Sequence, residues 1–179
     1  MKLILVKHGE TIANSEKILQ GNDGDSLTEK GRQQAKEVGK HLKDHHKIEM
    51  VFCSPLDQCV ETLDNILEEF PIEGEIFMSN LIEERDFGEY TGVEHHMMNW
   101  NEVNENNKIN RQMGVESLES LEKRIGLFLE DLKLENPEAN VLVISHEEPI
   151  KMMINKLSGG DMADDDLIHE FDYQVETEF

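Results

Sequence analysis

The sequence predicts an α/β protein with three layers, in which a mostly parallel central sheet carries helices on both faces. Short aliphatic runs alternate along the chain with segments whose apolar residues recur at helical spacing. This alternation is typical of parallel sheets covered by helices. The chain of 179 residues is long enough for one sizeable core and too short for two comfortable domains. We therefore expect a single domain over residues 1–179.

The first half of the chain contains two predicted strands and two predicted helices. Lys2–Val6 is a compact aliphatic run that ends at a loop, as a buried parallel strand does. Apolar residues from 29 to about 42 then recur at the period of an amphipathic helix. Met50–Cys53 is the next strand, and Pro55 suits the first turn of the helix that follows.

The second half continues the alternation around a polar insert. Glu75–Met78 is a predicted strand, and an Asn-rich insert at about 93–113 is expected to cap the site. Nothing in that insert indicates regular structure. Ser117 can cap a long helix, Val141–Ile144 is a buried strand, and Pro149 starts the last predicted helix.

Composition narrows the class of function. The net charge is −22, from 39 acidic and 17 basic residues, so the average surface potential repels nucleic acids and anionic membranes. No apolar run is long enough to span a membrane, and the apolar start is too short for a signal peptide. We expect a cytoplasmic protein whose two cysteines, Cys53 and Cys59, are reduced thiols in the core. The oligomeric state is not indicated.

Two histidines and a serine lie at the ends of predicted strands. His8 comes after the first strand, Ser54 after the second and His146 after the last. Ligands of such folds collect beyond the carboxyl ends of parallel strands, so we expect these three side chains to share one site. A single histidine is more often a hydrogen-bonded structural residue than a catalytic one, and the shared position is what favours catalysis here.

Five short blocks over nearly the whole chain form a recognisable pattern. They are Lys7-His8-Gly9-Glu10-Thr11 with Asn14 and Leu27-Thr28, Ser54-Pro55-Leu56 with Glu61-Thr62, Glu84 with Phe87, Gly88 and Gly92, Gly114 with Glu116, Ser117 and Arg124, and Ser145-His146. In this order they resemble the histidine phosphatase superfamily, in the branch of cofactor-dependent phosphoglycerate mutases and small-molecule phosphatases. The resemblance implies a phosphoglycerate mutase-like fold and phosphoryl-transfer chemistry.

The resemblance also implies a role for each residue of the site. His8 would attack phosphorus and become a transient phosphohistidine, and Glu84 would protonate the departing alkoxide. His146 would donate to phosphoryl oxygens, and Asn14 would add a neutral hydrogen bond. No metal or cofactor is implied, and the implied partner is a small phosphorylated substrate or inorganic phosphate.

The phosphate pocket departs from the family pattern in its charges. The family's first arginine is Lys7 here, which lacks the planar fork, and its second corresponds to the neutral Gln58. Glu147 replaces the glycine that commonly follows the second histidine, and its carboxylate would oppose a phosphate if it pointed inward but not if it lay in solvent at a helix N-terminus. Arg85 is a candidate replacement cation, with a surface ion pair as the alternative.

Three hypotheses about function follow. The first is a metal-independent phosphatase for a small phosphomonoester, with reduced or altered activity. A mutase is less favoured, because no Arg-Arg pair occurs in the insert. The second is a degenerate member of the family that binds a ligand or a protein without turnover. The third places a divalent cation among His8, His146, Glu84 and Glu147.

Two other clusters of polar residues suggest no site of their own. His41 and His45 lie one helical turn apart, a spacing that could hold a metal, but a solvated helix face is favoured. The aspartates at 164–166 are expected in a solvated turn, because the spacing and terminal Glu of an EF-hand are absent.

Overall fold

A four-stranded parallel sheet forms the centre of the computed structural model, which describes residues 1–105, 107–135 and 138–158. The strands are β1 (Lys2–Lys7), β2 (Met50–Cys53), β3 (Glu75–Met78) and β4 (Asn140–Ser145), in the order β1-β4-β2-β3. Because β4 pairs in parallel with both β1 and β2, the residues that follow these three strands lie side by side at one end of the sheet. The predicted strands are confirmed.

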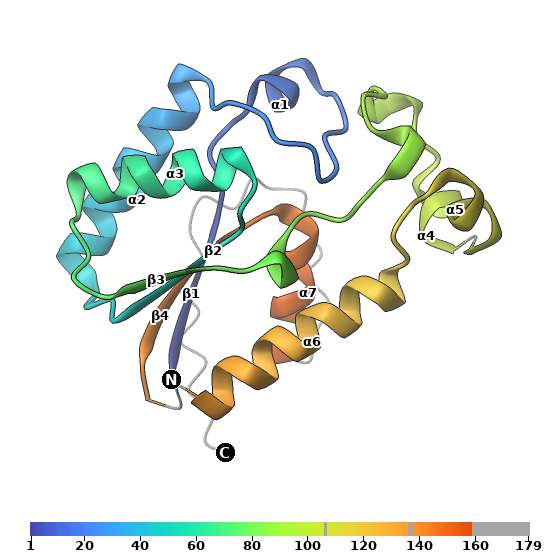
Figure 1. The fold of residues 1–179 in the computed structure, drawn as a ribbon. Coiled ribbons are helices and arrows are strands. Elements are labelled where there is room, and N and C mark those ends of the chain that lie inside the picture. The colour runs from blue at the N-terminus through green and yellow to red at the C-terminus, as the bar shows by residue number, and fades with distance from the viewer. Residues whose placement is uncertain (106, 136–137, 159–179) are drawn as a thin grey trace.

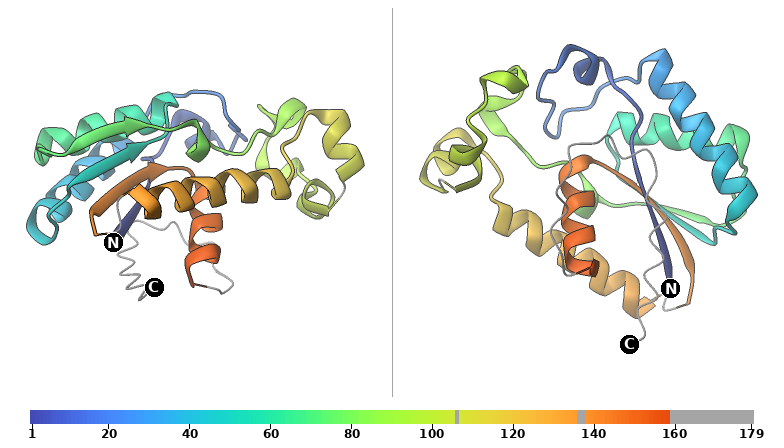
Figure 2. Two further views of the ribbon diagram at one scale, coloured as in Figure 1. Left: turned by 60° about the horizontal axis from the view of Figure 1, so that its bottom comes forward. Right: turned by 180° about the vertical axis from the view of Figure 1, so that it is seen from behind.

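Helices cover both faces of the sheet, which confirms the predicted three-layer α/β fold (Figures 1 and 2). The helices α2 (Glu29–His45) and α3 (Asp57–Glu69) pack on one face, and α6 (Leu118–Glu135) and α7 (Glu147–Ser158) pack on the other. The amphipathic period found in the sequence explains this, because each helix turns one apolar stripe to the sheet.

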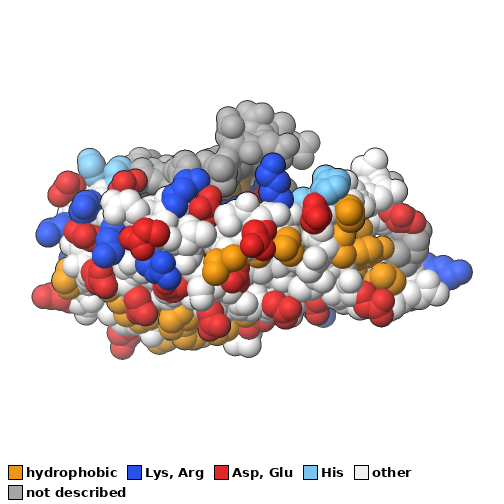
Figure 3. All heavy atoms as spheres, turned by 90° about the horizontal axis from the view of Figure 1, so that it is seen from above, with side chains coloured by type: hydrophobic (Ala, Val, Ile, Leu, Met, Phe, Trp, Pro, Cys, Tyr) orange, Lys and Arg blue, Asp and Glu red, His pale blue; other side chains and the backbone are white. Residues whose placement is uncertain are grey.

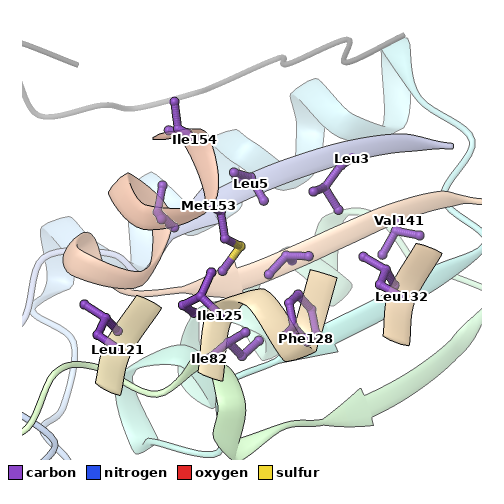
Figure 4. Packing of buried hydrophobic residues seen from close by; sticks show 12 residues of the cluster. Leu3, Leu5, Ile82, Leu121, Ile125, Phe128, Leu132, Val141, Met153 and Ile154 are labelled. Atoms are coloured by element: carbon purple, nitrogen blue, oxygen red, sulfur yellow. The ribbon is translucent and has the colours of Figure 1, made fainter. Parts of the chain in front are cut away.

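The core between the sheet and the pair α6 and α7 includes the apolar stripe of α6, which is Leu121, Ile125, Phe128 and Leu132 (Figure 4). Burying each such aliphatic or aromatic side chain contributes about 1.5–3 kcal/mol. The buried members are Leu3, Leu5, Ile82, Leu121, Ile125, Phe128, Leu132, Val141, Val143, Ile150, Met153 and Ile154. This packing holds α6 and α7 against the strands that carry both histidines.

The polar insert is more regular than the sequence indicates. After the short helical turns η1 (Asn80–Ile82), η2 (Gly88–Tyr90) and η3 (His95–Met97), it forms α4 (Trp100–Glu105) and α5 (Asn107–Met113). Val103 of α4 is buried with Leu19, Phe87 and Val115 in a small separate core. These partners are distant in sequence, which is why the local pattern does not predict the helices.

Three further differences from the sequence expectations concern helix starts. The last helix, α7, begins at Glu147 and not at Pro149 as predicted. The single-turn helix α1 (Ile12–Glu16) is not predicted; a capping box between Thr11 and Asn14 starts it. The position predicted for Pro55 is wrong, because α3 begins at Asp57 with Leu56 as N-cap, and Pro55 precedes the cap.

The residues from 159 onward, including the three aspartates at 164–166, lie outside the described part of the chain. Among the described helices, none has the length and apolar character needed to cross a membrane.

Candidate active site

His8 lies directly after β1 and is buried, with its backbone N–H donating to the carbonyl of Ser145 on β4 (3.0 Å). Its Nδ1 lies 2.8 Å from the carbonyl oxygen of Gly9. A carbonyl only accepts, so Nδ1 carries the proton and Nε2 keeps its lone pair. Burial, the largest cause, lowers the pKa of His8 to about 4. The imidazole is therefore neutral near pH 7, as a nucleophile requires.

The loop that carries His8 is held by α2 and α3. The backbone N–H of Gly9 donates to Thr62 Oγ1 of α3 (3.0 Å), and the carbonyl of Glu10 accepts from the Thr28 N–H (2.8 Å). A Cβ added at Gly9 would lie 2.4 Å from the carbonyl oxygen of Gly31, a backbone atom that cannot swing away. Only glycine fits this approach, which explains the glycine after the histidine.

His146 follows β4 and is fully buried beside His8. The centroids of the two rings are 5.2 Å apart in an edge-to-face arrangement. Ser54, which follows β2, places its Oγ 2.7 Å from His146 Nε2. Burial, with the charges nearby, lowers the pKa of His146 well below its usual value. The three strand ends thus converge as predicted and create a pair of neutral imidazoles.

Glu84 lies in the segment after η1 and is partly buried, with Oε1 accepting the backbone N–H of Arg85 (2.9 Å). Burial, helped by the carboxylates of Glu148 and Glu147, raises the pKa of Glu84 to about 7 against the opposing effects of the Arg85 backbone N–H and of Lys7. A carboxyl group with a pKa near the working pH is suited to proton transfer.

Two neutral histidines with a titratable carboxyl at the end of a parallel sheet fit the family that the sequence resembles. The sequence model of the histidine phosphatase superfamily, branch 1, matches residues 3–172. This chain belongs to that superfamily. Proteins similar to it include both phosphatases and mutases, so phosphoryl chemistry is supported at the level of the family.

Three similar proteins illustrate the range. Phosphoserine phosphatase 1 from Hydrogenobacter thermophilus is 33% identical over 170 residues, which are 91% of this chain and 79% of that protein. A mutant phosphoserine phosphatase from Entamoeba histolytica, solved in complex with phosphoserine, has a TM-score of 0.74 and 26% identity, covering 88% of this chain and 80% of that one. A phosphoglycerate mutase from Bacillus anthracis shares the fold, with a TM-score of 0.75 and 23% identity over 89% of this chain and 80% of that one.

Lys7, which lies directly before His8, forms an ion pair with Glu147. Lys7 Nζ lies 2.7 Å from Glu147 Oε2, and Lys151 Nζ lies 2.8 Å from Glu147 Oε1. Burial acts to raise the pKa of Glu147, but the two lysines outweigh it and lower the pKa to about 2. The sequence leaves open whether Glu147 points inward or lies in solvent at a helix N-terminus. Its side chain is 48% exposed and forms ion pairs, so its position is intermediate between the two. The charge of Lys7 is neutralised in this arrangement.

The neutral residues expected at the phosphate make contacts within the protein. Gln58 is buried, and its Oε1 accepts the backbone N–H of Asp25 (3.3 Å). Asn14 is exposed, and its Oδ1 accepts the backbone N–H of Thr11 (3.1 Å) in the capping box of α1. The contacts of both with phosphate stay predictions.

Arg85 is 1% exposed, so the predicted alternative of a surface ion pair is wrong. Its guanidinium donates to the carbonyls of Glu116 (2.8 Å) and Val103 (3.3 Å) and to Asn104 Oδ1 (2.8 Å), and it lies 5.2 Å from the centre of the Phe87 ring. These contacts tie the insert to the segment that carries Glu84. The role of Arg85 against phosphate stays a prediction.

Sequence reasoning assigned no role to Cys59, Ser145 or Arg124. Cys59 Sγ lies 3.4 Å from His146 Nε2, and burial raises the pKa of this thiol well above its usual value. The Ser145 hydroxyl donates to the carbonyl of Ile82 (2.7 Å). Arg124 and Ser145 both belong to the blocks that resemble the superfamily, and this match is the signal that the sequence offers for them.

The charge around the site has two features that bear on the hypotheses. No group of three or more His, Cys, Asp or Glu side chains among the described residues is arranged to hold a metal ion, so the geometry does not support a divalent cation among the two histidines and the glutamates.

Seen from the side toward which β1 runs, the surface shows many acidic side chains and fewer basic ones (Figure 3). Phosphate binding therefore depends on local donors.

Proposed function

We propose that this chain is a phosphatase that hydrolyses a small phosphomonoester through a phosphohistidine on His8. The observation that carries the proposal is the pairing of His8 and His146, two buried neutral imidazoles with ring centroids 5.2 Å apart at neighbouring strand ends. The hydrogen bond from His8 Nδ1 to the Gly9 carbonyl directs the lone pair of Nε2 outward as the nucleophile.

In the first step, His8 Nε2 forms a bond to phosphorus as the bond from phosphorus to the ester oxygen breaks. The departing oxygen takes the proton of the Glu84 carboxyl, which is partly protonated near pH 7 because burial raises its pKa to about 7. His146 donates an N–H to a phosphoryl oxygen, and Ser54 orients the His146 ring through the 2.7 Å contact.

In the second step, water attacks the phosphohistidine. The Glu84 carboxylate accepts a proton from the attacking water, the bond from phosphorus to Nε2 breaks, and inorganic phosphate leaves. His8 is then neutral again. Each residue has the protonation state needed for the next turnover, and no metal is required by this sequence of steps.

Phosphoserine is the first substrate to test. The relative that is 33% identical over 91% of this chain is named a phosphoserine phosphatase, and a similar solved structure contains phosphoserine. The serine alkoxide is a poor leaving group, so its departure needs the proton that we assign to Glu84.

A degenerate, binding-only protein is the second candidate, and one contact favours it. Glu147 neutralises Lys7 at 2.7 Å, and Gln58 carries no charge. A phosphoryl transition state spreads negative charge over three oxygens, and one arginine at such a site can contribute about 10³ to 10⁵ in rate.

The experiment is turnover of phosphoserine and other phosphomonoesters in the presence of a chelator, with His8→Ala beside the exposed His45→Ala as a matched control. We expect metal-free turnover that only His8→Ala abolishes, and an acid-labile phosphohistidine trapped in a rapid quench. Absence of turnover and of phosphohistidine overturns the proposal in favour of the binding protein. Activity that appears only in Gln58→Arg with Glu147→Gly would show that charge loss silenced the site.

A further inference from the structure

We propose that Arg124 and Ser145 are positioning residues that fix the segment carrying Glu84, and thereby aim its carboxyl at the leaving group. The inference rests on the phosphatase mechanism proposed above and adds two residues that act on one step of it. Neither touches the substrate in this proposal. They act through the backbone of residues 81–84.

Four consecutive carbonyl groups of this segment accept hydrogen bonds from side chains. Arg124 Nη1 donates to the carbonyls of Leu81 (2.8 Å) and Glu83 (2.7 Å), and Nη2 donates to that of Glu84 (3.2 Å). The Ser145 hydroxyl donates to the carbonyl of Ile82 between them (2.7 Å). Beyond η1 this backbone belongs to no helix or strand, so these side chains supply the partners that a regular element would supply.

Arg124 itself is held by a bidentate ion pair. Its Nε and Nη2 each lie 2.9 Å from an oxygen of Glu116, and both side chains are mostly buried, at 16% and 15% exposure. The planar fork of arginine suits this geometry, and a lysine cannot reproduce it. The Glu116 backbone N–H also donates to the carbonyl of Asp86 (2.8 Å), so one ion pair is fastened to both sides of Glu84.

Apolar packing holds the start of the segment, and hydrogen bonds determine its end. Ile82 lies beside Ile125 and Phe128 of α6 in the core (Figure 4). Glu84 has no such apolar anchor, and its own side chain accepts only the Arg85 backbone N–H among the contacts of the described residues. The direction of its carboxyl therefore follows from where Arg124 holds the backbone.

Ser145 links this segment to the other half of the machinery. It is the last residue of β4, it precedes His146, and its own carbonyl accepts the backbone N–H of His8 (3.0 Å). One residue thus touches the backbone of the nucleophile and the backbone of the acid-bearing segment. A change at its hydroxyl removes a single hydrogen bond and leaves the β-ladder in place.

The test compares two substrates that differ in their need for an acid. The leaving group of phosphoserine needs a proton, whereas p-nitrophenolate leaves as a stabilised anion. General acids contribute about 10² to 10⁴ in rate. For Arg124→Gln we expect kcat on phosphoserine to fall about ten- to a hundredfold, part of that contribution, with kcat on p-nitrophenyl phosphate changed by less than about threefold and KM nearly unchanged. Arg32→Gln, at an ion pair on α2, is the matched control.

Glu84→Gln supplies the second part of the test. Because Arg124 acts through Glu84, the double variant should be no slower on phosphoserine than Glu84→Gln alone, since the two changes remove one function. Arg124→Lys should recover part of the loss. Ser145→Ala should show the same selectivity with a loss of about three- to tenfold, from one hydrogen bond of about 0.5–1.5 kcal/mol, and it provides the measurement if Arg124→Gln does not fold.

The outcomes separate this inference from the proposed function. Equal losses on both substrates, or losses that add to those of Glu84→Gln, overturn the positioning role while the phosphatase mechanism stands. An inactive wild-type protein overturns both.

The alkaline limb of the pH profile gives an independent measurement, because it reports the titration of Glu84. The groups that face Glu84 are Lys7, Glu147, Glu148 and Arg85 together with Arg124. A shift of that limb in Ser145→Ala, with the other charges intact, supports displacement of the carboxyl.

Discussion

Burial acts on His8 and Glu84 in opposite directions because one is cationic and the other anionic when charged. It lowers the pKa of His8 to about 4 and raises that of Glu84 to about 7. The reactive form of His8 is neutral and is gained as pH rises through 4. The reactive form of Glu84 is protonated and is lost as pH rises through 7. Between these limits both groups are ready for the first step.

We expect kcat/KM for phosphoserine to be bell-shaped, with limbs near pH 4 and pH 7, after correction for the substrate phosphate, whose second pKa is about 6. The measurement is initial rate at low substrate concentration from acid to alkaline pH. Glu84→Gln should lose the alkaline limb along with most of its activity. An alkaline limb that persists in this variant would assign that titration to another group.

Glu147 is the residue at which a single change is expected to improve binding. Glu147→Gln removes the partner of Lys7 and leaves its ammonium able to face phosphate. Because the pair is partly exposed, it contributes only about 0.2–1 kcal/mol, and KM should fall by about two- to fivefold. The matched control is Glu122→Gln, which breaks the pair with Lys156. An unchanged or higher KM in Glu147→Gln would show that Lys7 does not serve the phosphate.

For single residues, the sequence predicts the location of His8, His146 and Ser54 well, because each follows a strand and the strands determine where it lies. It predicts Arg85 poorly. The acceptors of the Arg85 guanidinium are the carbonyls of Val103 and Glu116 and the Oδ1 of Asn104, and their approach depends on how the insert folds. Backbone carbonyls from any part of the chain can accept the hydrogen bonds of a buried guanidinium. No local sequence pattern therefore predicts where such a side chain points.

Between elements, the His8 loop and α2 approach each other closely at Gly9 and Gly31, where no side chain separates the two backbones. A Cβ added at Gly31 would lie 2.1 Å from the carbonyl oxygen of Glu10. Gly31→Ala must therefore push the loop and the helix apart, and we expect a loss of about 1–3 kcal/mol in the free energy of unfolding together with a fall in kcat. The measurements are urea unfolding and phosphoserine turnover.

Gly126→Ala on α6 is the matched control for this contact. A Cβ there would meet only the end of the Lys156 side chain, at 3.7 Å. Helix propensity then favours alanine by about 0.5–1 kcal/mol, so this variant should be slightly more stable and fully active. If Gly31→Ala were equally stable and active, the loop would not depend on this close approach.

The large elements follow from periodicity, and the small ones do not. The stripe of α6 and the strand β4 appear in the sequence because burial on the sheet imposes their spacing. Instead, α4 buries Val103 against Leu19 and Phe87, and Met113 of α5 packs against the same cluster, so the order of both helices comes from contacts across the chain. The turn α1 depends on one capping box, which is too short to show a period.

The whole molecule carries a net charge of −22. The sequence alone does not show where on the surface this charge lies. The structure shows acidic side chains on the face toward which β1 runs (Figure 3), and Lys7, directly before His8, is paired with Glu147. A dianionic substrate therefore approaches against the average field of the protein. Efficient binding at low salt therefore has to come from short-range donors at the site, such as the imidazole of His146.

Salt should consequently help this protein bind its substrate. Raising NaCl from about 0.01 M to about 0.15 M shortens the screening length from about 30 Å to about 8 Å, so the repulsion by distant carboxylates fades while short contacts in the pocket persist. We expect KM for phosphoserine to fall severalfold over this range, with kcat nearly constant, and sucrose at matched osmolality to have no such effect. A KM that rises with salt would mean that local cations dominate the field at the pocket, and that the neutralisation of Lys7 by Glu147 does not persist when the substrate binds.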